Sequence, residues 1–263
     1  YCAEGYIPTQ NADGTYGVRV ANYVAQIGEA KFESLEDAFA AIPTDNSDVT
    51  ITLLKDVVMG TIEVPGNTGW ITLTAEQPVT IQQTTVSDFG MTESTSKGLK
   101  IEKNVTFKVY DNASGAYFYY GPSLIVNGTL TGGENWGCLY VFNGEHVVNA
   151  GATVSVGRVQ SAFDTLTVYG TMDTNYLLIE GGKFIADGAI VDANVIYHNN
   201  NGGQRWGAST FEFKNGAKVT TTKLTLSYAE TKLTMDLTST LTANTVVGVG
   251  KIIVDATGFN GET

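Results

Sequence analysis

Apolar and polar residues alternate in short runs along most of the chain, and each run ends in a glycine or a polar turn before the alternation resumes. Alternation places every second side chain on the same face of a β-strand. One such unit cannot bury its apolar face alone, so the pattern predicts that units stack on one another. The copies begin at Leu99, Leu124, Val147, Leu166, Phe184, Phe211 and Leu233, at unequal intervals.

A mean repeat of about 22 residues has room for three strands of four or five residues and the turns between them. Glycine adopts positive φ readily and would form the corners, while threonine suits the outward positions of strands. The sequence therefore predicts an all-β fold, a parallel β-helix. A β-sandwich is the less favoured alternative, because several repeats contain Asn-Gly, which is a hairpin signal.

One helix is expected, near the N-terminus. Ser34 suits the N-cap position, Asp37 follows at the third helical position as in a capping box, and Pro43 ends the helix. A solenoid exposes core and strand edges at its ends, so we expect this helix to cap the mouth of the first coil. Its apolar stripe, spaced i, i+3, i+4 and i+7, consists of Leu35, Ala38, Phe39 and Ile42.

The chain is expected to have two parts and to belong to a longer protein. Residues 1–48 would form an N-terminal segment with the capping helix, and residues 49–263 the coils of a single continuous domain. Residues 1–93 hold 13 acidic and 3 basic side chains, and the rest of the chain holds 14 and 12. The acidic excess favours a solubilising surface. A calcium-binding face is the alternative, but no Asp-x-[Asp/Asn]-x-[Asp/Asn]-Gly run supports it.

Composition excludes several other classes of protein. The 263 residues carry a net charge of −12, are 43% hydrophobic and include 35 Thr and 30 Gly. A disordered chain would be less hydrophobic, and a membrane span would need about 20 consecutive apolar residues, which do not occur. No Lys/Arg patch is present to neutralise phosphates, so neither nucleic acid nor membrane insertion is expected.

The segment from about residue 5 to residue 57 resembles a known family closely, and the rest of the chain resembles it only as generic β-helix repeats. The run Tyr23-Val-Ala-Gln-Ile-Gly28, the segment Phe32–Ile42 and the strand-like Val49–Val57 are similar to the first segment of pectin-lyase-like right-handed β-helices. The version most similar is that of secreted or wall-attached proteins of Gram-positive gut bacteria, and Gly5–Gly17 is similar to segments that precede it. The resemblance implies a right-handed parallel β-helix with an N-terminal capping helix, in an extracellular or cell-wall-attached bacterial protein.

The resemblance raises the question of catalysis, since many proteins of that fold are polysaccharide lyases or glycosidases. Its hydrolases usually carry adjacent aspartates and a His-Gly pair, and neither occurs in this chain. Asp187 and Asp192 are five positions apart and are expected to be solvated turn residues. Arg158 and Arg205 are the arginines of the repeat section, and neither lies beside an acidic cluster. The sequence therefore predicts no catalytic residue.

Metal and cofactor sites are not expected either. His146 and His198 each lack a partner at the spacing of metal ligands, and both are expected at the surface or at a corner. Cys138 lies in an apolar, strand-like setting that would keep its thiol protonated and inert. Cys2 and Cys138 lie far apart along the chain, and the sequence leaves open whether they pair.

Aromatic residues gather in the middle of the chain and favour a binding surface instead. Alternation within 117–120 puts two rings on each face of a strand, so only half of them can belong to the core. The polar, glycine-rich segment 198–207 interrupts the repeats, and loops on a rigid scaffold often carry function. An aromatic core with a connecting loop is the alternative. The candidate binding residues are Tyr117, Tyr119, Trp136, Arg205 and Trp206.

The sequence thus predicts a non-enzymatic module of a bacterial surface or secreted protein, acting as a rigid stalk or as an adhesin-like binding domain for a glycan or a host-surface protein. A polysaccharide lyase or glycosidase is the alternative. Ice or mineral binding, suggested by Thr220–Thr222, is a weaker third class because regular Thr-x-Thr spacing across successive coils is missing. Three Asn-x-Ser/Thr sequences, at Asn104, Asn112 and Asn127, would matter only in a eukaryotic secretory pathway.

Overall fold

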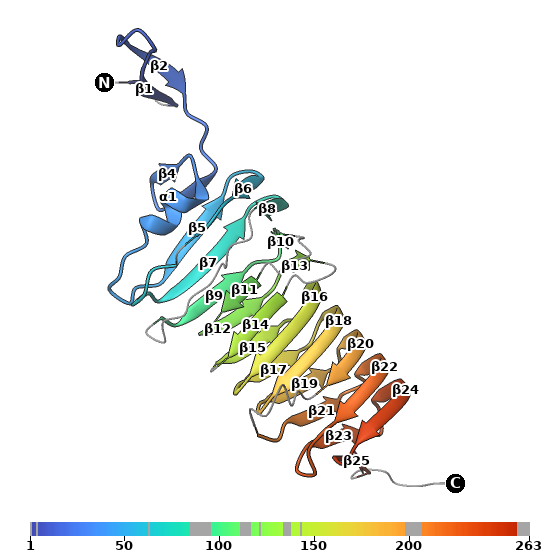
Figure 1. The fold of residues 1–263 in the computed structure, drawn as a ribbon. Helices are drawn as coiled ribbons and strands as arrows, with labels where there is room; N and C mark the ends of the chain where they lie inside the picture. The colour runs from blue at the N-terminus through green and yellow to red at the C-terminus, as the bar shows by residue number, and fades with distance from the viewer. Residues whose placement is uncertain are drawn as a thin grey trace.

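The fold is a long β-solenoid preceded by a small hairpin (Figure 1). The computed structural model describes the chain apart from residues 1, 4, 63, 85–95, 111–116, 121, 134–137, 143, 198–206 and 257–263, and for residues 117–120 and 138 it describes the backbone alone. The hairpin consists of two antiparallel strands, β1 (Tyr6–Gln10) and β2 (Tyr16–Val20).

Two sheets form the solenoid. Within the described residues the first sheet contains β3 (Ala25–Ile27), β4 (Ala30–Phe32), β5 (Val49–Leu53), β7 (Trp70–Ala75), β9 (Gly98–Ile101), β12 (Ser123–Val126), β15 (Glu145–Val148), β17 (Thr165–Val168), β19 (Lys183–Asp187), β21 (Thr210–Lys214), β23 (Lys232–Asp236) and β25 (Lys251–Asp255). The second sheet contains β6 (Val57–Met59), β8 (Val79–Gln83), β10 (Val105–Val109), β11 (Tyr117–Tyr120), β13 (Thr129–Gly132), β14 (Cys138–Phe142), β16 (Thr153–Ala162), β18 (Thr171–Glu180), β20 (Ile190–Tyr197), β22 (Lys218–Leu226) and β24 (Thr240–Gly248).

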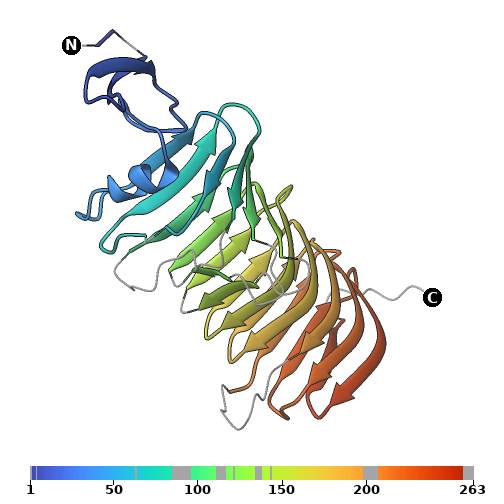
Figure 2. The ribbon, with the colours of Figure 1, turned by 45° about the horizontal axis from the view of Figure 1, so that its top comes forward.

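The chain passes from one sheet to the other and back, and each strand pairs with the strand one coil later. All these pairings are parallel except those of β3 with β4 and with β5, which are antiparallel. Figures 1 and 2 show the coils stacked along one axis. The prediction of an all-β, parallel solenoid is therefore confirmed.

Each central coil has three sides, as the repeat length predicts. The strands β16, β18, β20 and β22 bend midway, and their pairing skips one position at the bend, passing from Thr174↔Ala193 to Tyr176↔Val195. In two earlier coils the segment after the bend is a separate strand. In one of them β13 pairs with the first half of β16 and β14 pairs with the second half. The second sheet thus supplies two sides of the coil and the first sheet supplies the third.

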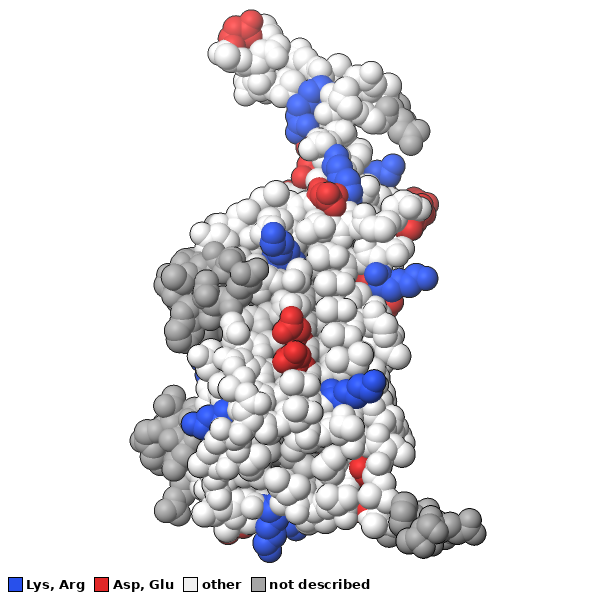
Figure 3. Space-filling model, turned by 90° about the vertical axis from the view of Figure 1, so that its right-hand side faces the viewer, with Lys and Arg blue, Asp and Glu red and all other residues white. Residues whose placement is uncertain are grey.

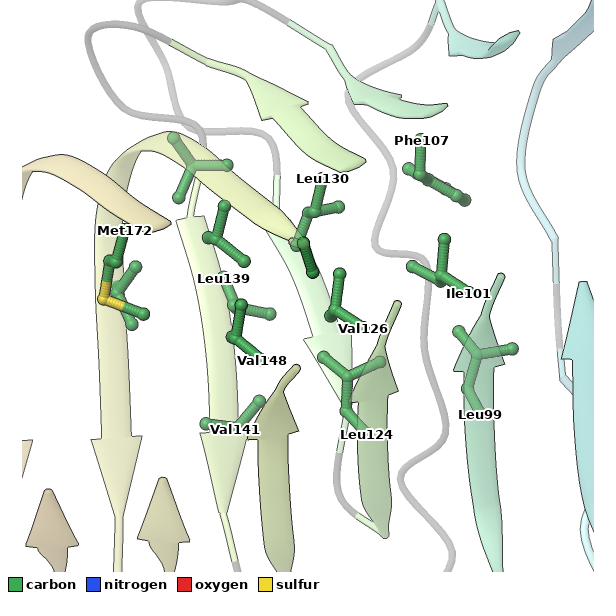
Figure 4. Close-up of a cluster of buried hydrophobic side chains, with 14 of the residues drawn as sticks. Leu99, Ile101, Phe107, Leu124, Val126, Leu130, Leu139, Val141, Val148 and Met172 are labelled. Carbon is green, nitrogen blue, oxygen red and sulfur yellow. The ribbon is translucent and has the colours of Figure 1, made fainter. Parts of the chain in front are cut away.

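A single apolar core runs along the axis between the sides (Figure 4). Every second residue points inward in strands such as β5 and β10, which alternate between buried and more exposed residues. Aromatic rings fill the later coils, where the centroids of Phe184 and Phe211 lie 6.4 Å apart. Stacked inward rows therefore replace the layered core of a globular domain.

The predicted repeat alignment is largely correct. Leu99 pairs with Leu124, and Phe184 pairs with both Leu166 and Phe211. One copy is shifted by a single position, because Ile125, and not Leu124, pairs with Val147. The inward position of that coil is therefore occupied by a histidine, His146, which pairs with Leu166.

The predicted helix is present as α1 (Leu35–Ala40). The Asp37 backbone amide donates to Ser34 Oγ at 3.1 Å, so Ser34 is the N-cap. The four residues of the predicted stripe are all buried, and α1 contacts β3, β4 and β6. The Gly60 amide also donates to the Glu36 carboxylate at 2.8 Å, which ties α1 to the residue after β6. That α1 acts as the cap of the solenoid remains a prediction.

Truncating Phe39 tests that role. The Phe39→Ala variant should lose roughly 3–5 kcal/mol of unfolding free energy in urea, because the buried ring leaves a cavity at the end of the core. The matched control is Tyr16→Ala on the exposed hairpin, which should change the free energy by no more than about 0.5 kcal/mol. A Phe39→Ala loss below about 1 kcal/mol would show that the coils do not need the helix.

The turn after β23 provides a pH-dependent contact. The Asp236 carboxylate accepts hydrogen bonds from the Asn215 backbone amide at 2.7 Å, the Thr238 hydroxyl at 2.8 Å and the Ser239 backbone amide at 2.9 Å. Burial raises the pKa of Asp236, but these hydrogen bonds outweigh burial and hold the pKa at about 2, below its ordinary value of 3.8. The folded state therefore prefers the ionised form more strongly than the unfolded state does.

This pKa predicts how stability changes with acid. A lowered pKa contributes stability above about pH 4, and the contribution is lost as the pH falls towards about 2. Asp236→Asn keeps the acceptor oxygen but cannot be protonated, so its unfolding free energy should fall less over that window than that of the unchanged chain. Urea unfolding at several pH values measures this difference, and parallel curves for the two proteins would contradict it.

Candidate functional site

The outer face of the second sheet carries a row of threonines. Thr80, Thr106, Thr129, Thr153 and Thr171 pair in succession across five neighbouring strands. Stacked residues of a sheet lie about 4.8 Å apart, so this threonine row repeats its hydroxyl groups at that distance. The row has one threonine per strand, and two residues further along these strands only β13 has a second threonine, Thr131.

A second row runs beside it, two residues further along each strand. This polar row consists of Lys108, Thr131, Ser155, Asp173, Asp192 and Thr220. Lys108, Asp173 and Asp192 are exposed, and Thr131 and Ser155 are half-buried. Figure 3 views this side of the molecule, where charged side chains are sparse and most of the surface is uncharged. The two rows form a narrow band of hydrogen-bonding groups parallel to the axis.

A groove of about 670 Å³ lies along the polar row, where the strands of the second sheet bend. Its lining includes Thr131, Ser155 and Asp173 on the polar row, and Gly132 and Asn175 at the bend. Gly132 has φ +103°, and a Cβ atom there would lie 2.4 Å from the Val109 carbonyl oxygen. Only glycine fits at that position, which lets the chain turn closely against the previous coil.

Two of the predicted binding residues, Tyr117 and Tyr119, belong to the strand segments on the other side of this bend. Tyr117 pairs with Cys138, and Tyr119 pairs with Tyr140. Those positions are in register with Arg158 and Gln160, which lie between the buried positions of β16. The positions of Tyr117 and Tyr119 are therefore in register with half-buried positions of β16, while those of Phe118 and Tyr120 are in register with the buried Leu139 and Val141. Their side chains, and Trp136, Arg205 and Trp206, lie outside the described residues.

Five described residues complete this side, which we call the aromatic strip: Tyr140, Phe142, Arg158, Tyr176 and Tyr197. The rings of Tyr140 and Phe142 stack with centroids 5.8 Å apart, and Tyr176 meets Tyr197 edge to face at 6.4 Å. Tyr176 pairs directly with Arg158. The sequence does not indicate Tyr176 or Arg158 as site residues, because their pairing depends on a register that no local pattern reveals.

Asp187 and Asp192 differ from the expectation of solvated turn residues. Asp187 ends β19 and is tied to its neighbours, since its carboxylate lies 3.3 Å from Lys214 Nζ and accepts from Asn215 Nδ2 at 2.6 Å. Asp192 is exposed but lies within β20 and pairs with Asp173. The two aspartates therefore lie on different sides of the coil, and Asp192 is part of the polar row.

His146 corrects another expectation, because it is buried and not at the surface. Its Nδ1 accepts from the Leu124 amide at 3.2 Å, so its proton lies on Nε2, which faces Asp164 Oδ2 at 3.3 Å. Ser161 Oγ donates to the other oxygen of Asp164. Ser161 binds the aspartate and not the histidine, and all three residues are buried, so the cluster is built for structure and not for nucleophilic attack.

Of the remaining residues named from the sequence, Asn104 and Asn127 form hydrogen bonds within the fold. Asn104 donates to the Ala75 carbonyl at 2.9 Å, and Asn127 donates to Glu102 and accepts from Asn149 at 2.6 Å. Cys2 has a free thiol. The side chain of Cys138, and all of Asn112 and His198, lie outside the described residues.

Comparison with known proteins identifies no relative of this chain. Scans against family models, curated proteins and solved structures found no match for this chain. Within the described ranges, no group of three or more His, Cys, Asp or Glu residues could hold a metal ion. No helix in the same ranges is long and apolar enough to cross a membrane.

The buried cluster should matter for stability. Asp164→Ala removes the carboxylate that both His146 Nε2 and Ser161 Oγ face, and should cost roughly 3–5 kcal/mol of unfolding free energy, because the buried donors lose their partner. Asp173→Ala on the exposed polar row is the matched control and should change the unfolding free energy by no more than about 0.5 kcal/mol. Equal effects in urea unfolding would refute a structural role for the cluster.

Proposed function

We propose that this chain is a non-enzymatic, extracellular β-helix module of a bacterial surface or secreted protein, and that it binds a glycan along the outer face of the second sheet. The observation that carries the proposal is the parallel course of the threonine row and the polar row on one side of the bend in the second sheet and of the aromatic strip on the other. A host-surface glycan would be a ligand of the same chemistry.

Repetition is the first argument for an extended polymer. The rows present hydroxyl, carboxylate and ammonium groups once per coil, at intervals of about 4.8 Å along the axis. A polysaccharide offers hydroxyl groups at regular intervals along its own length, so one chain could bond to several coils at once. The groove beside Ser155 and Asp173 gives such a chain a concave path.

Aromatic rings are the second argument. Tyrosine combines an apolar face with a hydroxyl group, which suits the apolar faces and the polar edges of sugar rings. Tyr176 is exposed and lies one position beyond Asn175, which lines the groove. A sugar in the groove would therefore have hydrogen-bonding groups on one side and a ring on the other. Asp173 and Asp192 would repel uronates, which favours a neutral glycan.

The alternative, a polysaccharide lyase or glycosidase, is favoured by one observation. Asp173 and Asp192 are register neighbours, so their Cα atoms lie about 4.8 Å apart on the exposed face. Glycoside hydrolysis uses a pair of carboxylates. Lys108, the basic residue of the same row, is three strands from Asp173, at about 14 Å, which is too far to act on the same bond.

One experiment separates these functions. The chain is screened on a glycan array and incubated with neutral and uronic polysaccharides, and new reducing or unsaturated ends are assayed. Tyr176→Ala should weaken binding of the best neutral glycan roughly tenfold, while Tyr169→Ala, an exposed tyrosine outside the strip, should leave the affinity unchanged.

The other outcomes contradict the proposal in different ways. New chain ends that disappear in Asp173→Asn would establish the enzyme. Neither binding nor turnover would leave the module as a rigid stalk alone. Equal losses in Tyr176→Ala and Tyr169→Ala would place the binding surface elsewhere.

A further inference from the structure

The N-terminal hairpin stands clear of the coils. Figures 1 and 2 show β1 and β2 beyond the first coil and joined to it by a single connection. Neither strand packs extensively on another described helix or strand. A cleft of about 550 Å³ lies between the two parts, lined by Gly5 and Tyr6 on the side of the hairpin and by Glu29 and Lys31 on the side of the solenoid. Apolar packing therefore contributes little to the orientation of the hairpin.

The connection between the two parts is short. Ala21 still belongs to the hairpin, because its amide donates to the Gly5 carbonyl at 2.8 Å. Val24 already belongs to the solenoid, because its amide donates to the Phe32 carbonyl at 2.8 Å. Only the two residues between Ala21 and Val24 are thus left as a hinge for the hairpin.

One carboxylate joins both sides of this connection. Glu33 lies directly before the N-cap of α1 and accepts from Arg19 of β2 through both oxygens, with Nη1 at 2.7 Å from Oε1 and Nη2 at 2.5 Å from Oε2. Its Oε1 also accepts from the Asn22 backbone amide at 2.6 Å. The Asn22 side chain in turn accepts from Lys55, which follows β5. Hairpin, connection and first coil therefore meet at Glu33.

The geometry of this contact fixes an angle as well as a distance. Two parallel hydrogen bonds between a guanidinium and a carboxylate hold the two planar groups in one orientation. The Arg19 guanidinium, helped by the Asn22 amide, lowers the pKa of Glu33 from its ordinary value of 4.5 to about 2, so the carboxylate remains ionised at neutral and mildly acidic pH. Exposed ion pairs contribute little to stability, so the contact sets the position of the hairpin and not the stability of the coils.

We propose that Glu33 is a latch that fixes the orientation of the hairpin on the solenoid, and that the hairpin turns about residues 22 and 23 when the latch is opened. With the latch closed, the hairpin and the coils move as one rigid body. With the latch open, the two connecting residues alone link them, and the cleft beside Tyr6 gives the hairpin room to move.

Residual dipolar couplings of the backbone amides test the latch, because they average over hinge motions as slow as milliseconds. In the unchanged chain the couplings of the hairpin and of the coils should fit one common alignment. In Glu33→Gln the couplings of the hairpin should fall by about half or more, because motion averages them, while those of the coils stay the same. The urea midpoint of the coils should not change, since Ser34 still caps α1.

Asp48→Asn is the matched control, because it removes the exposed ion pair between Asp48 and Lys97 on the coils and leaves Glu33 intact. It should not change the couplings of the hairpin. Arg19→Ala should act like Glu33→Gln, and the double variant should be no looser than either single variant, because both changes remove the same contact. A hairpin that keeps its couplings in Glu33→Gln, that is already averaged in the unchanged chain, or that is looser in the double variant than in both single ones would overturn the proposal.

Discussion

Backbone pairing between one coil and the next is the constraint from which the rest of this structure follows. Parallel hydrogen bonds place a residue above its counterpart 18 to 28 positions earlier, at a spacing of about 4.8 Å. An inward residue must therefore fit the inward residues of both neighbouring coils, and an outward residue is repeated in a row. The core and the candidate binding face are two results of the same pairing, one for each side of the strands.

The His146 cluster shows how far the core tolerates a departure from this rule. A polar residue at an inward position is costly unless its groups are paired. His146 meets this requirement at Nδ1, which accepts from a backbone amide, whereas its Nε2 lies 3.3 Å from Asp164 Oδ2 without forming a hydrogen bond. Ser161 donates to the other oxygen of that carboxylate. Every partner comes from the same coil or an adjacent one, so the exception is resolved locally and the apolar rows continue on both sides of it.

Helix α1 and most of the repeats could be predicted because their signals are local. The N-cap and the apolar stripe of the helix lie within a single short segment, and the strands alternate visibly. The register between coils could not be predicted as reliably, because the connections vary in length. The repeat pattern aligns Val147 with the inward residues, one position away from His146, which is the inward residue in the structure. The threonine row could not be recognised because different numbers of residues separate its members along the chain. Likewise, Arg158 and Tyr176 are neighbours only because their strands pair in this register. Of the candidate site, sequence could identify aromatic residues but not the rows that align them.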